Sequence, residues 1–233
     1  MHNNTHVNLK VVAEVARVLG NLNAEVAYIG GAIISIYATD KGAELPRVTT
    51  DVDVCVQVSN FLEMELLREQ LAKKKIYPDP KGTHLYRYTY QGILIDFIPF
   101  EETPFGPTNT YLKSGFDKAY KTTIDDIEIS VLPVPIFLAT KWEAFNSRGS
   151  DPRLSHDFED IIYILDNNLE LVDEAIEASS EVKTALKKMS SFILEHPNRQ
   201  EIIECHINQI TAQEGGEYII EILQRINLLE DTK

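Results

Sequence analysis

The residue pattern from Asp51 to Val58 limits the fold more than any other stretch of this 233-residue chain. Four valines, at positions 52, 54, 56 and 58, alternate with Asp51, Asp53, Cys55 and Gln57. Alternation with a period of two predicts a β-strand whose two faces differ in polarity. Residues two apart on a strand point to the same side, about 6.5–7 Å apart. Asp51 and Asp53 are therefore expected on one face, where two carboxylates could share hard divalent cations that prefer oxygen ligands.

A Gly-Gly pair precedes this strand. Gly30 and Gly31 follow the apolar stretch 26–29, an expected short strand, and precede an expected helix at 32–38. Glycine lets backbone N–H groups come close to an anion, and the N-terminus of the following helix favours phosphate. A Gly-Gly pair alone is commonly a plain turn, and an Asp-x-Asp on a strand is commonly a solvated face. Their occurrence together, in this order, favours a functional site.

A single carboxylate interrupts the apolar run from Ile93 to Ile98. Burying an unpaired carboxylate is strongly unfavourable. Asp96 is therefore expected to face a metal ion, another cation or an open cleft.

These three features together resemble the motif of the DNA polymerase β-like nucleotidyltransferase superfamily. That motif consists of Gly-Gly or Gly-Ser, an Asp-x-Asp on one strand, and a third carboxylate on a neighbouring strand. The resemblance covers about residues 26–98. A second part, in segments 132–144 and 156–161, is similar to the AbiEii-like branch, which has a lysine near an alanine (Lys141) and a helix that begins with Asp-x-x-Asp (Asp157 and Asp160).

The resemblance implies an α+β fold, with a nucleotidyltransferase-type mixed β-sheet flanked by helices and followed by a C-terminal helical bundle. We expect a catalytic domain at residues 1–148 and a helical domain at 149–233, with the linker at 146–155. In the first domain, apolar periodicity and turn residues predict helices at 8–22, 60–75 and 135–145, and hairpins formed by 84–90 with 92–98 and 119–123 with 127–132. The second domain is expected to contain only helices, at 156–167, 170–178, 181–195, 199–209 and 215–228.

Charge is unevenly distributed along the chain. The net charge is −14, and residues 151–233 hold 18 acidic against 7 basic side chains. An acidic segment repels the nucleic acid backbone, which argues against extensive duplex binding. Six basic residues cluster in the first domain and could form a local patch for nucleic acid, although a solvated helix end is the favoured interpretation: Arg68, Lys73, Lys74, Lys75, Lys81 and Arg87.

The resemblance also assigns roles to individual residues. It implies that Asp51 and Asp53 bind Mg²⁺ or Mn²⁺, and that Asp96 completes one metal site and helps to deprotonate the acceptor. Gly30 and Gly31 would hold the triphosphate of a nucleoside triphosphate. Two further groups are candidates for contacting phosphate oxygens: Arg47, which could equally be an ordinary surface arginine, and the threonine pair Thr49 and Thr50.

The AbiEii-like part implies that Lys141 is a phosphate-binding cation, paired with or oriented by Asp157. The alternative is a lysine whose apolar stem passes the edge of the core. His156 and Asp160 are weaker candidates, and Asp160 is expected to cap or support its helix.

The sequence therefore predicts a nucleotidyltransferase that moves a nucleoside monophosphate from a nucleoside triphosphate to an acceptor hydroxyl by two-metal catalysis. The acceptor could be a tRNA or other RNA end, a protein or a small molecule. The resemblance favours a toxin of a toxin–antitoxin or phage-defence system, with an antitoxin as protein partner. The alternative is a non-catalytic nucleotide-binding protein that acts as a regulator or interaction partner. The polar first residues and the lack of an apolar run of about 18 residues favour a cytoplasmic protein without a membrane partner.

Overall fold

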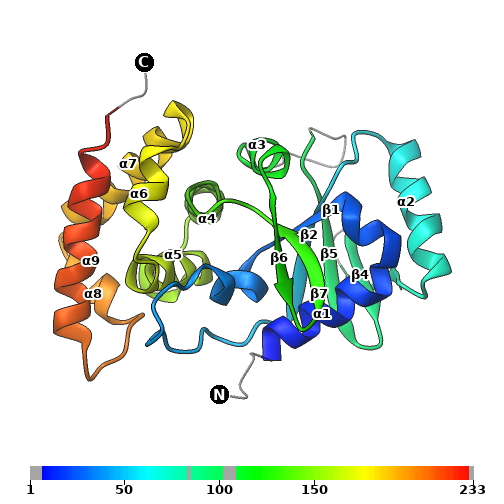
Figure 1. Cartoon of the computed structure of the whole chain (residues 1–233), viewed down its shortest axis with the longest axis horizontal. Helices are drawn as coiled ribbons and strands as arrows, with labels where there is room; N and C mark the ends of the chain where they lie inside the picture. The colour runs from blue at the N-terminus through cyan, green and yellow to red at the C-terminus, as the bar shows by residue number, and fades with distance from the viewer. Residues whose placement is uncertain (1–6, 83–84, 102–108, 231–233) are drawn as a thin grey trace. The chain divides into compact units, whose positions relative to one another are not determined.

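The computed structural model describes residues 7–82, 85–101 and 109–230 (Figure 1). The chain forms two compact units, which are described one at a time. The first contains residues 1–35 and 47–133, and the second contains residues 36–46 and 134–233.

The first unit is built on a seven-stranded sheet in the order β3-β4-β5-β2-β1-β7-β6. β2 pairs with β5 and β1 with β7 in parallel, and the other neighbours are antiparallel. This confirms the predicted mixed sheet and both hairpins, although residue 84 of the first hairpin lies outside the described residues. The strands are β1 (Val26–Ile29), β2 (Asp51–Val56), β3 (Tyr77–Pro78), β4 (Arg87–Tyr90), β5 (Ile93–Pro99), β6 (Tyr120–Ile124) and β7 (Ile127–Val131).

Five helical segments accompany the sheet: α1 (Val7–Leu19), η1 (Gly20–Glu25), η2 (Gly31–Tyr37), α2 (Phe61–Lys73) and α3 (Leu112–Asp117). α1 buries Val12, Val15 and Leu19, as its predicted periodicity requires. The helix expected at 32–38 is the 3₁₀ helix η2. Its isoleucines are β-branched, and such side chains lose freedom against the preceding turn of an α-helix.

α2 begins as predicted but presents another face to the core. Asn60 caps it, since its side-chain oxygen accepts a hydrogen bond from the Glu63 N–H at 3.0 Å. Met64 and Leu71 are buried, whereas Leu62 is 70% exposed and Leu66 is 49% exposed. The apolar spacing of the helix predicts that Leu62, Leu66, Leu67 and Leu71 point inward, and for Leu62 and Leu66 this was wrong. Leu62 lies two positions before Met64, about 200° around the helix, so the two cannot share a face.

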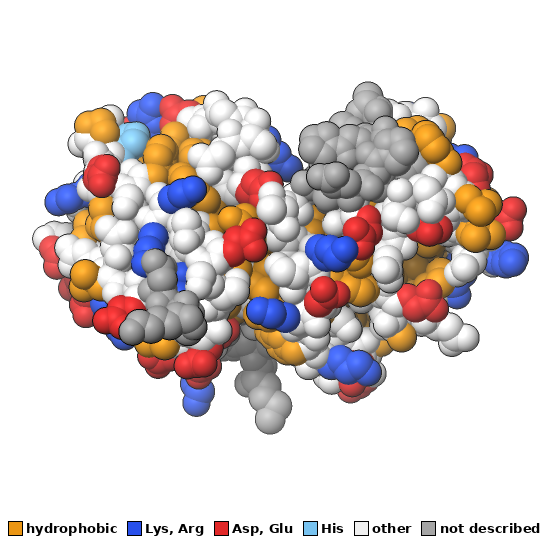
Figure 2. Space-filling view, turned by 90° about the horizontal axis from the view of Figure 1, so that it is seen from above, with side chains coloured by type: hydrophobic (Ala, Val, Ile, Leu, Met, Phe, Trp, Pro, Cys, Tyr) orange, Lys and Arg blue, Asp and Glu red, His pale blue; other side chains and the backbone are white. Residues whose placement is uncertain are grey.

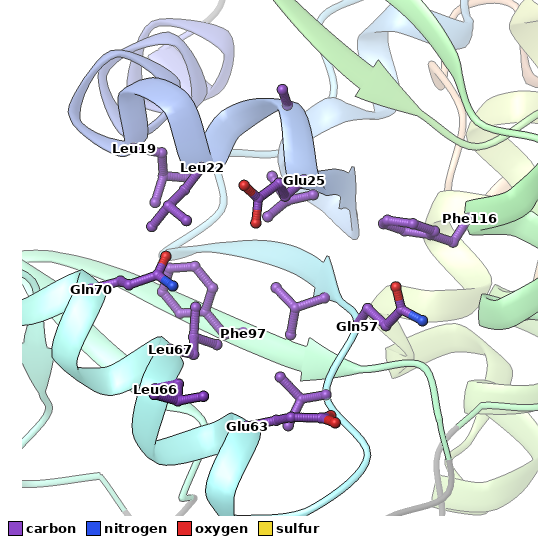
Figure 3. A pocket seen from close by; sticks show the side chains of 14 residues that line it. Leu19, Leu22, Glu25, Gln57, Glu63, Leu66, Leu67, Gln70, Phe97 and Phe116 are labelled. Carbon is purple, nitrogen blue, oxygen red and sulfur yellow. The ribbon is translucent and has the colours of Figure 1, made fainter.

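The register of the central strands gives the sheet one polar and one apolar face. Asp53 pairs with Asp96, and Val54 pairs with Phe97, across β2 and β5. Paired residues share a face, so the carboxylates lie on one side and Val52, Val54 and Phe97 on the other. On the apolar side, Leu19 and Leu22 lie opposite Leu66 and Leu67 of α2, around a pocket of about 410 Å³ (Figure 3).

The second unit is helical, which confirms the predicted C-terminal helical region. Ser155 and Ser179 cap two of its helices by accepting hydrogen bonds from Phe158 N–H and Val182 N–H. Segment 36–46 joins this unit, because the Asn168 side chain donates to the Tyr37 carbonyl at 2.8 Å. The helices are α4 (Val134–Arg148), η3 (Pro152–Leu154), α5 (His156–Asn167), α6 (Leu171–Ile176), α7 (Ser180–Glu195), α8 (Arg199–Glu204) and α9 (Ala212–Asn227).

α4, which the sequence analysis assigns to the first domain, is part of the second unit. Its Trp142 and Phe145 rings contact Phe192 of α7, with centroids 5.2 and 5.7 Å apart. The second compact unit takes up the chain again at residue 134, and the domain division after residue 148 stays a prediction. Within the described residues, no helix combines the length and the apolar character needed to cross a membrane.

Candidate active site

Strand register brings the three predicted carboxylates onto one face of two neighbouring strands. Asp53 on β2 lies directly opposite Asp96 on β5, and Asp51 lies two residues before Asp53 on the same face. Asp51 and Asp53 are half-buried, whereas Asp96 is only 6% exposed. The strands thus place the predicted carboxylate set together at the polar face of the sheet.

The buried carboxylate faces a cation, which is one of the three surroundings expected for it. Nε and Nη2 of Arg87 donate to Oδ1 and Oδ2 of Asp96 at 2.8 and 2.6 Å. Nη2 also donates to Oδ2 of Asp51 at 2.8 Å. The hydrogen bond to Asp96 raises the pKa of Arg87 above its ordinary value, with smaller contributions from the charges of Asp96, Asp51 and Asp53 against an opposing effect of burial. Arg87 therefore bridges two of the three carboxylates as a permanent positive charge.

Sequence reasoning placed Arg87 in a solvated basic cluster, and this was wrong. Arg87 belongs to β4, where it pairs with Asp96 of β5. The position of the hairpin turn indicates this pairing of Arg87 with Asp96. Gln91 and Gly92 both have positive φ, as two-residue hairpin turns of type I′ require. A two-residue turn at 91–92 pairs residue 90 with 93 and, three positions further, residue 87 with 96.

Gly30 lies against the same carboxylates. It follows Ile29, the β1 partner of Asp53, and has a φ of +76°. A Cβ at Gly30 would stand 1.9 Å from Oδ2 of Asp53. Only glycine fits both this backbone conformation and this close approach. Gly31 opens η2, and the role of both glycines at the triphosphate stays a prediction.

The segment before β2 is held by Asn8, a buried residue of α1 that sequence reasoning missed. The Asn8 amide donates to the Arg47 carbonyl at 2.9 Å, and its oxygen accepts from the Thr49 N–H at 3.0 Å. Thr50 is exposed directly before Asp51. The phosphate contacts expected for Arg47, Thr49 and Thr50 stay predictions.

The second unit contains the predicted Lys141–Asp157 pair within a larger cluster. Lys141 Nζ lies 2.7 Å from Oδ2 of Asp160 and 3.5 Å from Oδ1 of Asp157. Arg148 Nη1 lies 2.5 Å from the other oxygen of Asp157. Lys141 and both aspartates are buried. The nearer partner of Lys141 is thus Asp160, for which only a capping or supporting role was expected, while Asp157 pairs more closely with Arg148.

The sequence matches the model of a known protein family over most of its length. The sequence model described as "Nucleotidyl transferase AbiEii toxin, Type IV TA system" matches residues 30–217. The chain belongs to the AbiEii family of nucleotidyltransferase toxins. The match contains the glycine pair, the three carboxylates and the Lys141 cluster.

Two solved structures are similar to this AbiEii family member over most of their length. One is an antigenic nucleotidyltransferase-like protein from Paracoccidioides brasiliensis, with 19% identity, coverage of 86% of this chain and 94% of that chain, and a TM-score of 0.46. Another is JHP933 from Helicobacter pylori, with 11% identity, coverage of 95% and 93%, and a TM-score of 0.49. No protein of curated function matches the sequence.

The carboxylates of this family member fit a hard divalent cation in chemistry and in backbone placement. All three offer oxygen ligands, which Mg²⁺ and Mn²⁺ prefer, and two of them are direct neighbours across β2 and β5. The side chains of Asp51 and Asp96 are held by Arg87 instead. Among residues 7–82, 85–101 and 109–230, no three His, Cys, Asp or Glu side chains converge closely enough to hold a metal ion as they stand.

Proposed function

We propose that this AbiEii nucleotidyltransferase transfers a nucleoside monophosphate from a nucleoside triphosphate to an acceptor hydroxyl, using Mg²⁺ or Mn²⁺ held by Asp51, Asp53 and Asp96. The observation that carries this proposal is the register of β2 and β5, which sets Asp53 opposite Asp96 with Asp51 on the same face. Gly30, whose backbone lies against the Asp53 carboxylate, supports it.

The reaction places particular demands on these residues. A hydroxyl attacks the α-phosphate and pyrophosphate leaves, so charge builds up on oxygen atoms and catalysis depends on positioning and electrostatics. Divalent ions supply positive charge next to the attacking and leaving oxygens. Asp51 and Asp53 hold the ions. Both oxygens of Asp96 accept hydrogen bonds from Arg87, so Asp96 helps to deprotonate the acceptor only after that pairing opens.

The triphosphate requires its own contacts. We propose that Gly30 and Gly31 offer backbone N–H groups, while Thr50 and Arg47 contact phosphate oxygens. The role of Lys141 as a phosphate-binding cation stays a prediction. Asp160, at 2.7 Å, orients its ammonium more directly than Asp157 does.

The acceptor is expected to bind over a small area. Lys and Arg side chains lie singly among acidic ones on the visible face of the described residues in Figure 2. Together with a net charge of −14, this favours an RNA end, a protein side chain or a small molecule over extended nucleic acid. Because the family description names a toxin–antitoxin system, an antitoxin is the expected protein partner.

The experiment offers each of the four α-labelled ribonucleoside triphosphates with Mg²⁺ to the wild type, together with tRNA, cell lysate or an aminoglycoside panel. We expect label to move to one acceptor class, and Asp53→Asn to abolish the transfer. Asp126→Asn is the matched control, since Asp126 is an exposed turn residue whose positive φ asparagine tolerates.

The same variants are compared in thermal unfolding with and without Mg²⁺ and triphosphate. A ligand that binds only the native state stabilises it by about 2.7 kcal/mol at 100 times its Kd. We expect this stabilisation for the wild type and Asp126→Asn, and a much smaller one for Asp53→Asn. Stabilisation by nucleotide without any labelled product would favour the alternative, a non-catalytic nucleotide-binding regulator.

A further inference from the structure

Arg87 spans three strands of the sheet. From β4 it reaches Asp96 on β5 and Asp51 on β2, with three hydrogen bonds of 2.6–2.8 Å. The side chains of Arg87 and Asp51 are 25% and 29% exposed, and that of Asp96 is 9% exposed. These charges are partly shielded from water, so they interact more strongly than an exposed surface pair.

The guanidinium offsets charge that would otherwise be unfavourable. Three carboxylates lie on one face of two adjacent strands, and like charges so placed repel each other. Arg87 supplies one positive charge to them in a planar, two-pronged geometry that matches a carboxylate. This pairing uses both oxygens of Asp96 and one of Asp51.

A divalent ion needs the same oxygen atoms. Mg²⁺ binds carboxylate oxygens at about 2.0–2.1 Å, which would bring a double positive charge next to the guanidinium. The side chains as they stand do not form a metal-binding group within the described parts of the chain.

We propose that Arg87 competes with the divalent cation for Asp51 and Asp96, so that the ion binds only as the guanidinium withdraws. This inference rests on the proposed function, since it assumes that the carboxylates hold metal. Arg87 is then a positioning residue: it keeps the carboxylates paired in the metal-free protein and weakens the binding of the ion alone.

The test measures Mn²⁺ binding without nucleotide, from the electron paramagnetic resonance signal of the free ion, for the wild type and Arg87→Met. Methionine keeps an unbranched stem but removes the charge. We expect Arg87→Met to bind Mn²⁺ about tenfold more tightly, which corresponds to the loss of one charge-assisted hydrogen bond that the ion must displace. We also expect its metal-free form to melt at a lower temperature than the wild type and Mn²⁺ to restore much of that loss.

Two further variants complete the experiment. Arg87→Lys keeps the charge without the planar fork and should bind Mn²⁺ a few-fold more tightly than the wild type, so it carries the test if the methionine variant does not fold. Arg17→Met is the matched control, because it removes another Arg–Asp pair of the same unit, that with Asp125 at 2.6 Å. Its Mn²⁺ affinity should equal that of the wild type.

Equal or weaker Mn²⁺ binding by both Arg87 variants would overturn the inference and show that Arg87 preorganises the ligands. That outcome leaves the proposed function intact if the wild type binds Mn²⁺ and Asp53→Asn does not. If neither the wild type nor the Arg87 variants bind Mn²⁺, even with a triphosphate present, the metal assignment fails as well.

Discussion

The substitution Gly30→Ala tests whether the glycine before η2 is required by the carboxylate beside it. Gly30 has a φ of +76°, and a Cβ there would lie 1.9 Å from Oδ2 and 2.7 Å from Cγ of Asp53. Gly92 provides a matched control in the turn between β4 and β5. Its φ is +88°, but a Cβ there would meet nothing within 4 Å.

Both variants strain the backbone, but only Gly30→Ala also places a methyl group against another side chain. Left-handed backbone costs an L-residue about 1–2 kcal/mol, and this applies at both positions. At Gly30 the added methyl group also has to displace Asp53, and inserting a group into packed surroundings costs about 1–3 kcal/mol. Gly30→Ala should therefore destabilise the protein by about 2–5 kcal/mol and Gly92→Ala by about 1–2 kcal/mol.

Equilibrium urea unfolding of the metal-free variants measures this difference, and the labelled-nucleotide assay measures its effect on function. A misplacement of about 1 Å in an active site can cost about 100-fold in rate. We expect Gly30→Ala to lose transfer and Gly92→Ala to retain it. Equal stability and equal activity of the two variants would refute the reasoning. The close contact between residue 30 and the Asp53 side chain would then affect neither stability nor catalysis.

Two more predictions concern the second unit. Lys141→Met leaves the buried Asp160 without its 2.7 Å partner and should cost about 3–5 kcal/mol in urea unfolding. Asp157→Asn should cost less, since Arg148 is 65% exposed, and the reverse order would show that Asp157 is the main partner of Lys141. Burial, followed by the charges of Asp40 and Glu44, raises the pKa of Asp166 above its ordinary value of 3.8. The contribution of Asp166 to stability is therefore present at low pH and lost as pH rises through the raised pKa, so Asp166→Asn should raise the melting temperature at pH 7 and lose this advantage below about pH 4.

The sequence patterns that predicted structure correctly are those that depend only on residues close together in the chain. The alternation in β2 could be read because its valine face is buried and its aspartate face is polar. The helix expected at 156–167 has the bounds of α5, since Ser155 fixes its first turn as a cap. In both cases neighbouring residues decide the outcome.

The predictions that failed depend on how an element packs. Four leucines of α2 fit an inward stripe, yet the buried line runs through Met64 and Leu71. Apolar spacing gives the width of a stripe but does not say which residue lies at its centre.

The contact between Arg87 and Asp96 follows a geometric rule that the sequence contains. Antiparallel neighbours pair residues at equal distances from their connection, so a turn at 91–92 makes Arg87 the partner of Asp96. In the second unit, Arg148 of α4 pairs with Asp157 of α5, and Lys141 of α4 lies nearer to Asp160 than to Asp157. The pairing of Lys141 with Asp157 was predicted from the family motif, which gave no reason to prefer Asp160. Burial of Asp96 could show that a cation is needed, but only the register identifies it as Arg87.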